Sequence, residues 1–202
     1  NLYTVHAFPA ATAQVDRVGT GAVFVAPSGI AVDAAGVTLF VMDECVVRKV
    51  VIATGAVSFL AGGACDAPVD GPASAARFGR PPRISGVNVD VARSNHLLSN
   101  GTGGVYVADF AHGVVRLVDS RSGAVSTYAT GLFKPLAMAV GAASGELFVT
   151  NQASNVIFRV PPGGGLGSIV AGSPNVVGDV EGASAAGGAM FAPPPSRLSR
   201  AP

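Results

Sequence analysis

The sequence has no tryptophan, and only 12% of its 202 residues are charged. Its 13 basic and 12 acidic side chains nearly cancel, which leaves a formal net charge of +1 at pH 7. Proteins that bind nucleic acid or anionic membrane surfaces carry clusters of Lys and Arg that meet the phosphates. Because the sequence contains no such cluster, we expect no nucleic-acid partner.

Long apolar runs are also missing, although 49% of the residues are hydrophobic. Gly, Pro or polar residues interrupt every apolar stretch well before the roughly 18 residues that a membrane-spanning helix needs. We therefore expect no transmembrane segment. The sequence starts at Asn1 with neither an initiator Met nor a charged-then-apolar leader. We expect it to be a processed or trimmed product of a longer chain.

Cysteine is scarce as well, with Cys45 and Cys65 as the two examples. Neither lies in a C-x-x-C or His-rich context typical of zinc, so a structural pair is the better interpretation. Asn100, Gly101 and Thr102 form an N-glycosylation acceptor triplet. Together these features favour an oxidising, extracellular compartment over the cytosol.

The abundant residues, 27 Gly and 14 Pro, punctuate an internal repeat. Three units begin near Pro27, Pro82 and Pro135, and each contains four short runs rich in β-branched residues. The runs are 27–33, 39–43, 46–50 and 55–62 in the first unit, 86–90, 105–109, 114–118 and 123–128 in the second, and 136–140, 147–151, 156–160 and 166–172 in the third. Short runs bounded by Gly, Asp and Asn predict four antiparallel strands per unit.

The segments between units repeat too. The acidic-Gly, Ala-rich segment 70–78, which ends in Phe, is echoed by 181–191. Such a connector suits a chain that passes from the outer strand of one sheet to the inner strand of the next. Radial repetition of four-stranded sheets predicts an all-β fold, a β-propeller of four-stranded antiparallel blades. The predicted blades are 27–81, 82–134 and 135–192.

The remaining residues make less than a blade. Residues 1–5 align with 155–159, and residues 14–19 align with 167–172, so 1–26 is predicted to be the third and fourth strands of a partial blade. Residues 193–202 are a Pro-rich linker or the start of another blade. About three and a half blades are therefore visible. Because an unclosed ring exposes unpaired strand edges, either the sequence is a window from a longer propeller or copies of the chain complete one another by strand addition.

The repeat resembles the NHL-repeat propeller family, whose blades read P-x-G-I-A-V-D, then L-Y-V-A-D, then an Arg-containing strand, then G-x-V-x-T-x-A-G. The resemblance covers nearly all of residues 27–192. It is closest to extracellular members with a Cys before the Arg strand and a partner Cys after the A-G of the fourth strand, places that Cys45 and Cys65 occupy. The resemblance thus implies a disulfide in one blade, worth roughly 3 kcal/mol in the loop-closure picture.

Two sets of polar residues recur at matching places in the repeat. Asp43, Asp109 and Asn151 follow the second strand, and Arg48, Arg116 and Arg159 lie in the third. Together they could form a ligand face: the acidic and amide groups could hold Ca²⁺ or a polar ligand, and the arginines an anion. Turn chemistry alone also explains one Asp or Asn per blade, which is the interpretation we favour. The arginines would then lay their stems over apolar neighbours and hold their charged ends in water.

Catalytic patterns are weak. Some relatives of NHL propellers are lyases that mature amidated peptides and hold zinc with several histidines, but His6, His96 and His112 fall at unmatched repeat positions. No G-x-S-x-G elbow occurs, and the Gly-rich residues 163–167 follow two prolines, as in a hairpin tip. We predict no enzyme activity, no cofactor and no metal site.

Asn100 falls in residues 91–104, which appear as an insertion between the first and second strands of the second unit. A polar loop of this kind can carry a glycan without disturbing a sheet. The sequence thus predicts an extracellular, non-enzymatic scaffold or adhesion module, part of a self-assembling glycoprotein fibre or surface coat, with protein partners that could include its own copies. The alternatives are a propeller that binds a peptide or glycan, and a metal-dependent lyase or lactonase with part of its site elsewhere.

Overall fold

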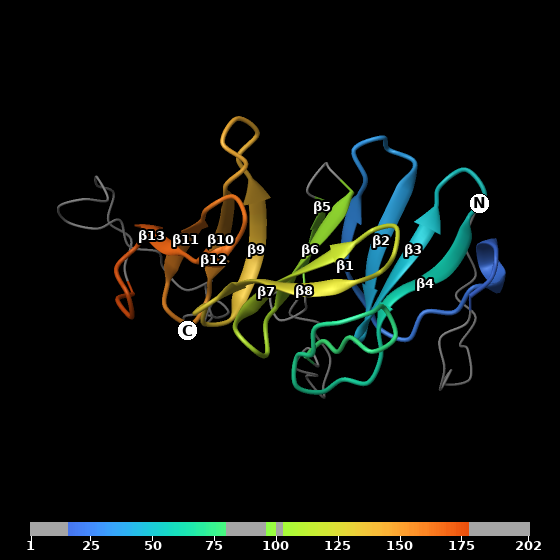
Figure 1. The fold of residues 1–202 in the computed structure, drawn as a ribbon, viewed down its shortest axis with the longest axis horizontal. Coiled ribbons are helices and arrows are strands. Elements are labelled where there is room, and N and C mark those ends of the chain that lie inside the picture. Colours follow the sequence, from blue (N-terminus) through green and yellow to red (C-terminus); the bar gives the residue numbers. More distant parts are fainter. Residues whose placement is uncertain (1–15, 80–95, 100–102, 178–202) are drawn as a thin grey trace, which may run out of the picture.

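A computed structural model of the chain describes residues 16–79, 96–99 and 103–177. Almost all regular structure in these residues is β (Figure 1). Apart from a three-residue 3₁₀ helix, η1 (Gly19–Gly21), the elements are β1 (Pro27–Val32), β2 (Thr38–Asp43), β3 (Val46–Val51), β4 (Ala56–Gly62), β5 (His96–Ser99), β6 (Gly104–Asp109), β7 (Val114–Asp119), β8 (Val125–Thr130), β9 (Pro135–Val140), β10 (Leu147–Asn151), β11 (Val156–Val160), β12 (Gly165–Leu166) and β13 (Ser168–Ala171).

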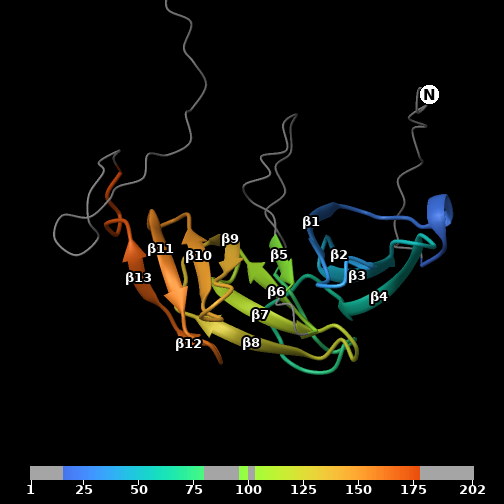
Figure 2. The same ribbon diagram turned by 90° about the horizontal axis from the view of Figure 1, so that it is seen from above.

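The strands form three sheets, each built from one repeat unit. The first has the order β1-β2-β3-β4, the second β5-β6-β7-β8 and the third β9-β10-β11-β13, with antiparallel neighbours throughout. The short strand β12 adds a parallel edge to β8 of the second sheet. Figure 2 shows the second sheet lying between the other two. Successive four-stranded antiparallel sheets packed side by side are the blades of a β-propeller, which confirms the predicted fold class.

The cores lie between the sheets, because alternate residues of a strand point to opposite faces. Val105 and Val107 of β6 pack toward the first sheet, in a cluster with Phe40 and Met42. Tyr106, between those two valines, packs toward the third sheet with Leu147 and Val149. Since both faces of the second sheet are covered, all six residues of β6 are buried. None of the helical structure in the described residues is long enough to cross a membrane.

The Ala-Gly pair that ends the fourth strand of a unit has a steric cause. Gly62 has φ +111° and Gly172 has φ +93°, both in the region that side chains avoid. A Cβ at either glycine would lie 2.3 Å from a carbonyl oxygen, that of Cys45 for Gly62 and that of Asn155 for Gly172. Only glycine lets the end of the fourth strand approach the turn between the second and third strands so closely.

The inner strand of the second sheet differs from the prediction. Residues 86–90, predicted to be this strand, lie outside the described residues, and β5 takes the position next to β6. Ser99 pairs with Val105 as Val32 pairs with Leu39, so residues 91–104 are not a simple insertion. The connection from β5 to β6 is only residues 100–103. Closing this short hairpin costs less chain entropy than closing a loop of fourteen residues, which accounts for the choice of strand.

The segment before the first sheet also differs. Residues 16–19, the described part of the predicted fourth strand 14–19, make only an isolated bridge between Val18 and Ala56. They belong to a connector, residues 16–26, that leads into β1. Residues 1–15 and 193–202 lie outside the described residues, so the rest of the partial blade and the Pro-rich linker stay predictions.

Candidate functional site: two arginine clamps

Arg48 of β3 is the centre of the first polar cluster. Only 1% of its side chain is exposed. Its Nη2 donates a hydrogen bond to Asp16 Oδ1 at 2.5 Å, and its Nη1 donates to the Val23 carbonyl at 3.0 Å and more weakly to Asp43 Oδ2 at 3.4 Å. The guanidinium also lies 5.0 Å from the centre of the Phe24 ring, within range of a cation-π contact. A charge this deeply buried is tolerated because these acceptors surround it.

The two carboxylates of this cluster fasten the incoming connector. Asp43 is fully buried, and its Oδ1 accepts hydrogen bonds from the backbone N–H groups of Val25 at 2.8 Å and Ala26 at 2.7 Å. Asp16, at the other end of the connector, accepts the N–H of Phe59 in β4 at 2.8 Å. The connector is thereby attached to β2, β3 and β4, and we call this arrangement an arginine clamp.

A second arginine clamp surrounds Arg116 of β7, whose side chain is wholly buried. Its Nη2 donates to Asp70 Oδ1 at 2.5 Å and to the Val69 carbonyl at 2.8 Å, and its Nη1 donates to the Arg77 carbonyl at 3.0 Å. The Phe78 ring centre is 5.7 Å from the guanidinium carbon. The connector from the first to the second sheet is thus held in the same way as residues 16–26.

Asp70 and Asp109 complete the second clamp. Asp70 accepts hydrogen bonds from the Thr127 N–H at 2.9 Å and the Thr127 hydroxyl at 3.0 Å. Partial burial acts to raise the pKa of Asp70, but the bonds from Thr127 and the charge of Arg116 outweigh it and hold that pKa below its ordinary value. The fully buried Asp109 accepts the N–H of Gly79 at 2.8 Å and lies 3.0 Å from His112 Nδ1.

The third sheet is built differently. Asn151 pairs with Val156, as Asp43 pairs with Val46, so Phe158 and not Arg159 occupies the position of Arg48. Arg159 is 51% exposed and has Glu146 at 3.6 Å. The connector from β8 to β9 is only residues 131–134 and carries no acidic residue. A short connector and the absence of the arginine therefore occur together.

Asn151 has no arginine beside it among the described residues, because Phe158 stands at the position that Arg48 occupies in the first sheet. The residue is 1% exposed, and within the described part of the chain neither Oδ1 nor Nδ2 has a hydrogen-bond partner. An amide tolerates such a position better than a carboxylate, because it carries no net charge to desolvate. The three residues of the predicted Asp/Asn ring thus have equivalent places in the fold but different surroundings.

The six residues of the predicted ligand face are not displayed together. Asp43 and Arg48 meet in one clamp, Arg116 and Asp109 lie in the other, and Arg159 lies on a different strand face from both arginines. The prediction that the charged ends of Arg48 and Arg116 reach water is wrong, because the two side chains are only 1% and 0% exposed and donate to acceptors on the connectors. It holds for the exposed Arg159.

Sequence reasoning missed Asp16 and Asp70, the partners of the two arginines. One signal could have revealed them: a Val-Asp pair stands eight residues before Phe24, and another stands eight residues before Phe78. Both phenylalanines are the rings beside the guanidinium groups. The spacing is therefore a signature of the clamp.

Cys45 and Cys65 form a disulfide, as expected. It joins the turn between β2 and β3 to the connector that follows β4. The backbone of Cys65 also forms an isolated parallel β-bridge with Phe78 of the second clamp. The disulfide therefore restrains the same connector that Arg116 holds, and disulfides are typical of compartments outside the cytosol.

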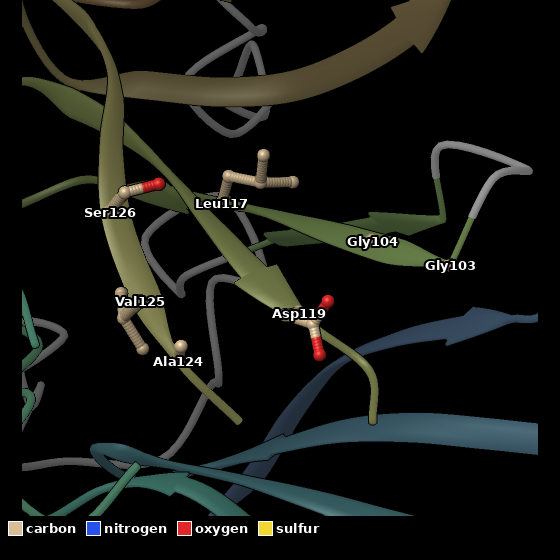
Figure 3. A pocket seen from close by; sticks show the side chains of 7 residues that line it. All are labelled: Gly103, Gly104, Leu117, Asp119, Ala124, Val125 and Ser126. Atoms are coloured by element: carbon tan, nitrogen blue, oxygen red, sulfur yellow. The ribbon is translucent and has the colours of Figure 1, made fainter. Parts of the chain in front are cut away.

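Two shallow cavities lie near the ends of the strands that are farther from Asp43 and Asp109, and both are lined in part by Gly103 and Gly104. One, of about 300 Å³, is lined by Gly103, Gly104, Leu117, Asp119, Ala124, Val125 and Ser126 (Figure 3). Hydrogen bonds from the Ser122 N–H and hydroxyl and from the Arg121 N–H to the Asp119 carboxylate lower its pKa and occupy it in the β7–β8 turn. The other, of about 240 Å³, lies between the first and second sheets near Asp33 and Lys49. Among the described residues, no three His, Cys, Asp or Glu side chains come together as a metal site.

Comparison with known proteins identifies the fold only. No protein-family model and no curated protein matches the chain. A solved protein of unknown function from Bacteroides thetaiotaomicron matches 82% of the chain with a TM-score of 0.59 and 14% identity. A streptogramin B lyase matches 76% (TM-score 0.49, 13% identity), covering 42% of that lyase, and virginiamycin B lyase from Staphylococcus aureus matches 71% (TM-score 0.46, 15% identity). The chain spans about 40% of the length of the first and third of these structures.

Proposed function

We propose that the chain is part of a β-propeller that serves outside the cell as a structural scaffold or adhesion module, within a glycoprotein fibre or surface coat, and that it is not an enzyme. The observation that carries this proposal is the pair of arginine clamps. In a propeller that captures ligands through recurring charges, those charges would be available to the ligand. Here they hold the connectors between sheets.

Burying Arg48 and Arg116 is energetically expensive, since each guanidinium loses its hydration. In exchange for this cost, each clamp holds a long connector against three strands of the next sheet. A chain that puts its repeated charges to this use is suited to keeping its shape under load, which is the requirement on a scaffold.

The compartment is inferred from two features. The disulfide restrains the connector after the first sheet, and the acceptor triplet at Asn100, which lies outside the described residues, stands in the sequence between β5 and β6. A hairpin connection at the end of two strands can carry a glycan without disturbing the ladder. We also propose that the propeller is of the NHL type, on the strength of the repeated residues.

The test uses the chain secreted from eukaryotic cells and an antibody that locates the protein in native material. We expect a mass that falls on glycosidase treatment, with no fall for Thr102→Ala, and antibody labelling of extracellular fibres or coats in electron microscopy. Bound metal near one ion per chain would overturn the proposal in favour of a metal-dependent lyase or lactonase. Specific retention on a glycan or peptide array would overturn it in favour of a binding propeller.

A further inference from the structure

The two ends of the row of sheets present faces that are of opposite kinds. The first outer face is the side of the first sheet that points away from the second. Ile30, Val41, Arg48 and Phe59 form one cross-strand line on it, and Val32, Leu39, Val50 and Val57 form the next. The alternate residues Phe40, Met42 and Val47 point the other way, into the core shared with the second sheet.

We call a face with the residues of Leu39 and Val41 a face of the first kind, and a face with those of Phe40 and Met42 a face of the second kind. The second sheet shows what covers a face of the first kind within the chain. Val105 and Val107 stand at the positions of Leu39 and Val41, and both are fully buried against the first sheet. On the first outer face the inner residues have no such cover, because Ile30 is 61% exposed and Val32 is 47% exposed. Phe59, on β4, is 42% exposed. The connector of the first clamp covers Arg48, but Ile30 and Val32 on β1 remain exposed.

We call the side of the third sheet that points away from the second sheet the third outer face. It is a face of the second kind. Phe148 occupies the position of Phe40 and Tyr106, since each pairs with the fourth residue of the strand that follows. Phe40 is 2% exposed and Tyr106 is 6% exposed, because each packs against the next sheet. Phe148 points away from the core of the second and third sheets, beside Ala139 and Arg159.

Faces of these two kinds pack together twice within the chain, once between the first and second sheets and once between the second and third. The open faces are therefore the two halves of an interface that the chain already forms. They lie at opposite ends of the row of sheets and do not meet within one chain (Figure 2).

We propose that a second copy of this chain supplies the cover, with its third outer face against the first outer face and the reverse at the other end. Two copies then close a ring of six sheets through two identical sheet-on-sheet interfaces, which is a contact that closes and does not propagate. The inference deepens the proposed structural function, on which it rests, by naming the surface through which the module assembles. It differs from strand addition, because the contact is between faces and not edges.

The test is the mass of the purified 202-residue chain by light scattering during gel filtration, from about 1 to about 100 µM. We expect twice the 19.9 kDa of one chain. Ile30→Asp at one face, and either Ala139→Arg or Phe148→Asp at the other, should each yield monomers with an unchanged circular dichroism spectrum. Leu166→Asp, at a residue that is 76% exposed on the edge strand β12, is the matched control and should remain a dimer.

Mixing the Ile30→Asp chain with the Ala139→Arg chain gives the sharpest result. A dimer of one Ile30→Asp chain and one Ala139→Arg chain has two interfaces, one with both substitutions and one with neither. We therefore expect dimers to form in the mixture, although each variant alone is monomeric. A wild-type chain that stays monomeric over the whole range overturns the inference and favours further sheets of the same polypeptide as the cover. Dimers that survive Ala139→Arg and Phe148→Asp overturn it too. Neither result affects the proposed function, which is tested by location, glycan, metal and ligand binding.

Discussion

Arg116 in β7 donates a hydrogen bond of 2.5 Å to Asp70, which stands 46 residues earlier in the connector between two sheets. Asp70 in turn binds Thr127 on β8, so one carboxylate joins the connector to two strands of the sheet that follows. Arg48 has the same relation to Asp16, 32 residues earlier. Each connector is thus held to the sheet that follows it by contacts between residues far apart in sequence.

The first prediction concerns the buried guanidinium. Arg116→Met should lower the free energy of unfolding by about 2 to 4 kcal/mol, because the carbonyls of Val69 and Arg77 lose their donor and Asp70 loses its partner. Arg159→Met is the matched control and should change it by about 0.5 kcal/mol or less, since that arginine is half exposed. Denaturant unfolding followed by circular dichroism measures both. Equal losses for the two variants would contradict a clamp.

The second prediction concerns pH. The pKa of Asp70 lies below its ordinary value of 3.8 in the folded chain, so its ionised form stabilises the fold above that pH. As the pH falls through the folded-state pKa, the carboxylate is protonated and this contribution disappears. Asp70→Asn should therefore be less stable than wild type at pH 7, and the difference should shrink as the pH drops well below 3.8. Asp66→Asn, outside the clamp, serves as the control, and a difference that stays constant with pH would refute the assignment.

Much of the fold follows from local sequence because the repeat is local. The second and third strands of each unit are β-branched runs bounded by turn residues, and they lie within one residue of the predicted positions, for example Leu147–Asn151 and Val156–Val160. The inner strand of the second unit was missed, because residues 86–90 alternate just as a strand does. The choice of β5 depends on the length of the connection to β6, which strand propensity does not measure.

The clamps were harder to foresee. Arg48, Arg116 and Arg159 look alike in sequence, each lying in a third strand that is rich in valine. Register separates them, since Arg159 stands one residue later and a one-residue shift moves a side chain to the opposite face. The carboxylates Asp16 and Asp70 stand outside the strands, so only the spacing from Asp16 to Phe24 and from Asp70 to Phe78 links them to the clamps.

The third prediction concerns the disulfide. Replacing Cys45 and Cys65 together by Ala should lower the free energy of unfolding by about 3 kcal/mol, because the bond no longer restrains the unfolded chain across a separation of 20 residues. Thermal melts of wild type and the double variant, each with and without reductant, measure this. Reductant should lower the melting temperature of wild type and leave that of the double variant unchanged. A wild-type chain insensitive to reductant would contradict the prediction.

The last prediction uses the third sheet, where the position of Asp43 and Asp109 is held by Asn151. Asn151→Asp places a carboxylate at a site 1% exposed, with Phe158 where the first two sheets have arginine. Burial without a cation raises the pKa of the introduced group, so the variant should lose about 3 to 5 kcal/mol at pH 7 and recover as the pH falls through that raised value. This dependence is opposite to that of Asp70, whose contribution is lost on acidification. Asp43→Asn is the reciprocal control, and unfolding at several pH values measures both. A third sheet that accepts Asn151→Asp without loss at pH 7 would mean that another group neutralises the site, and that the amide there does not reflect the missing clamp.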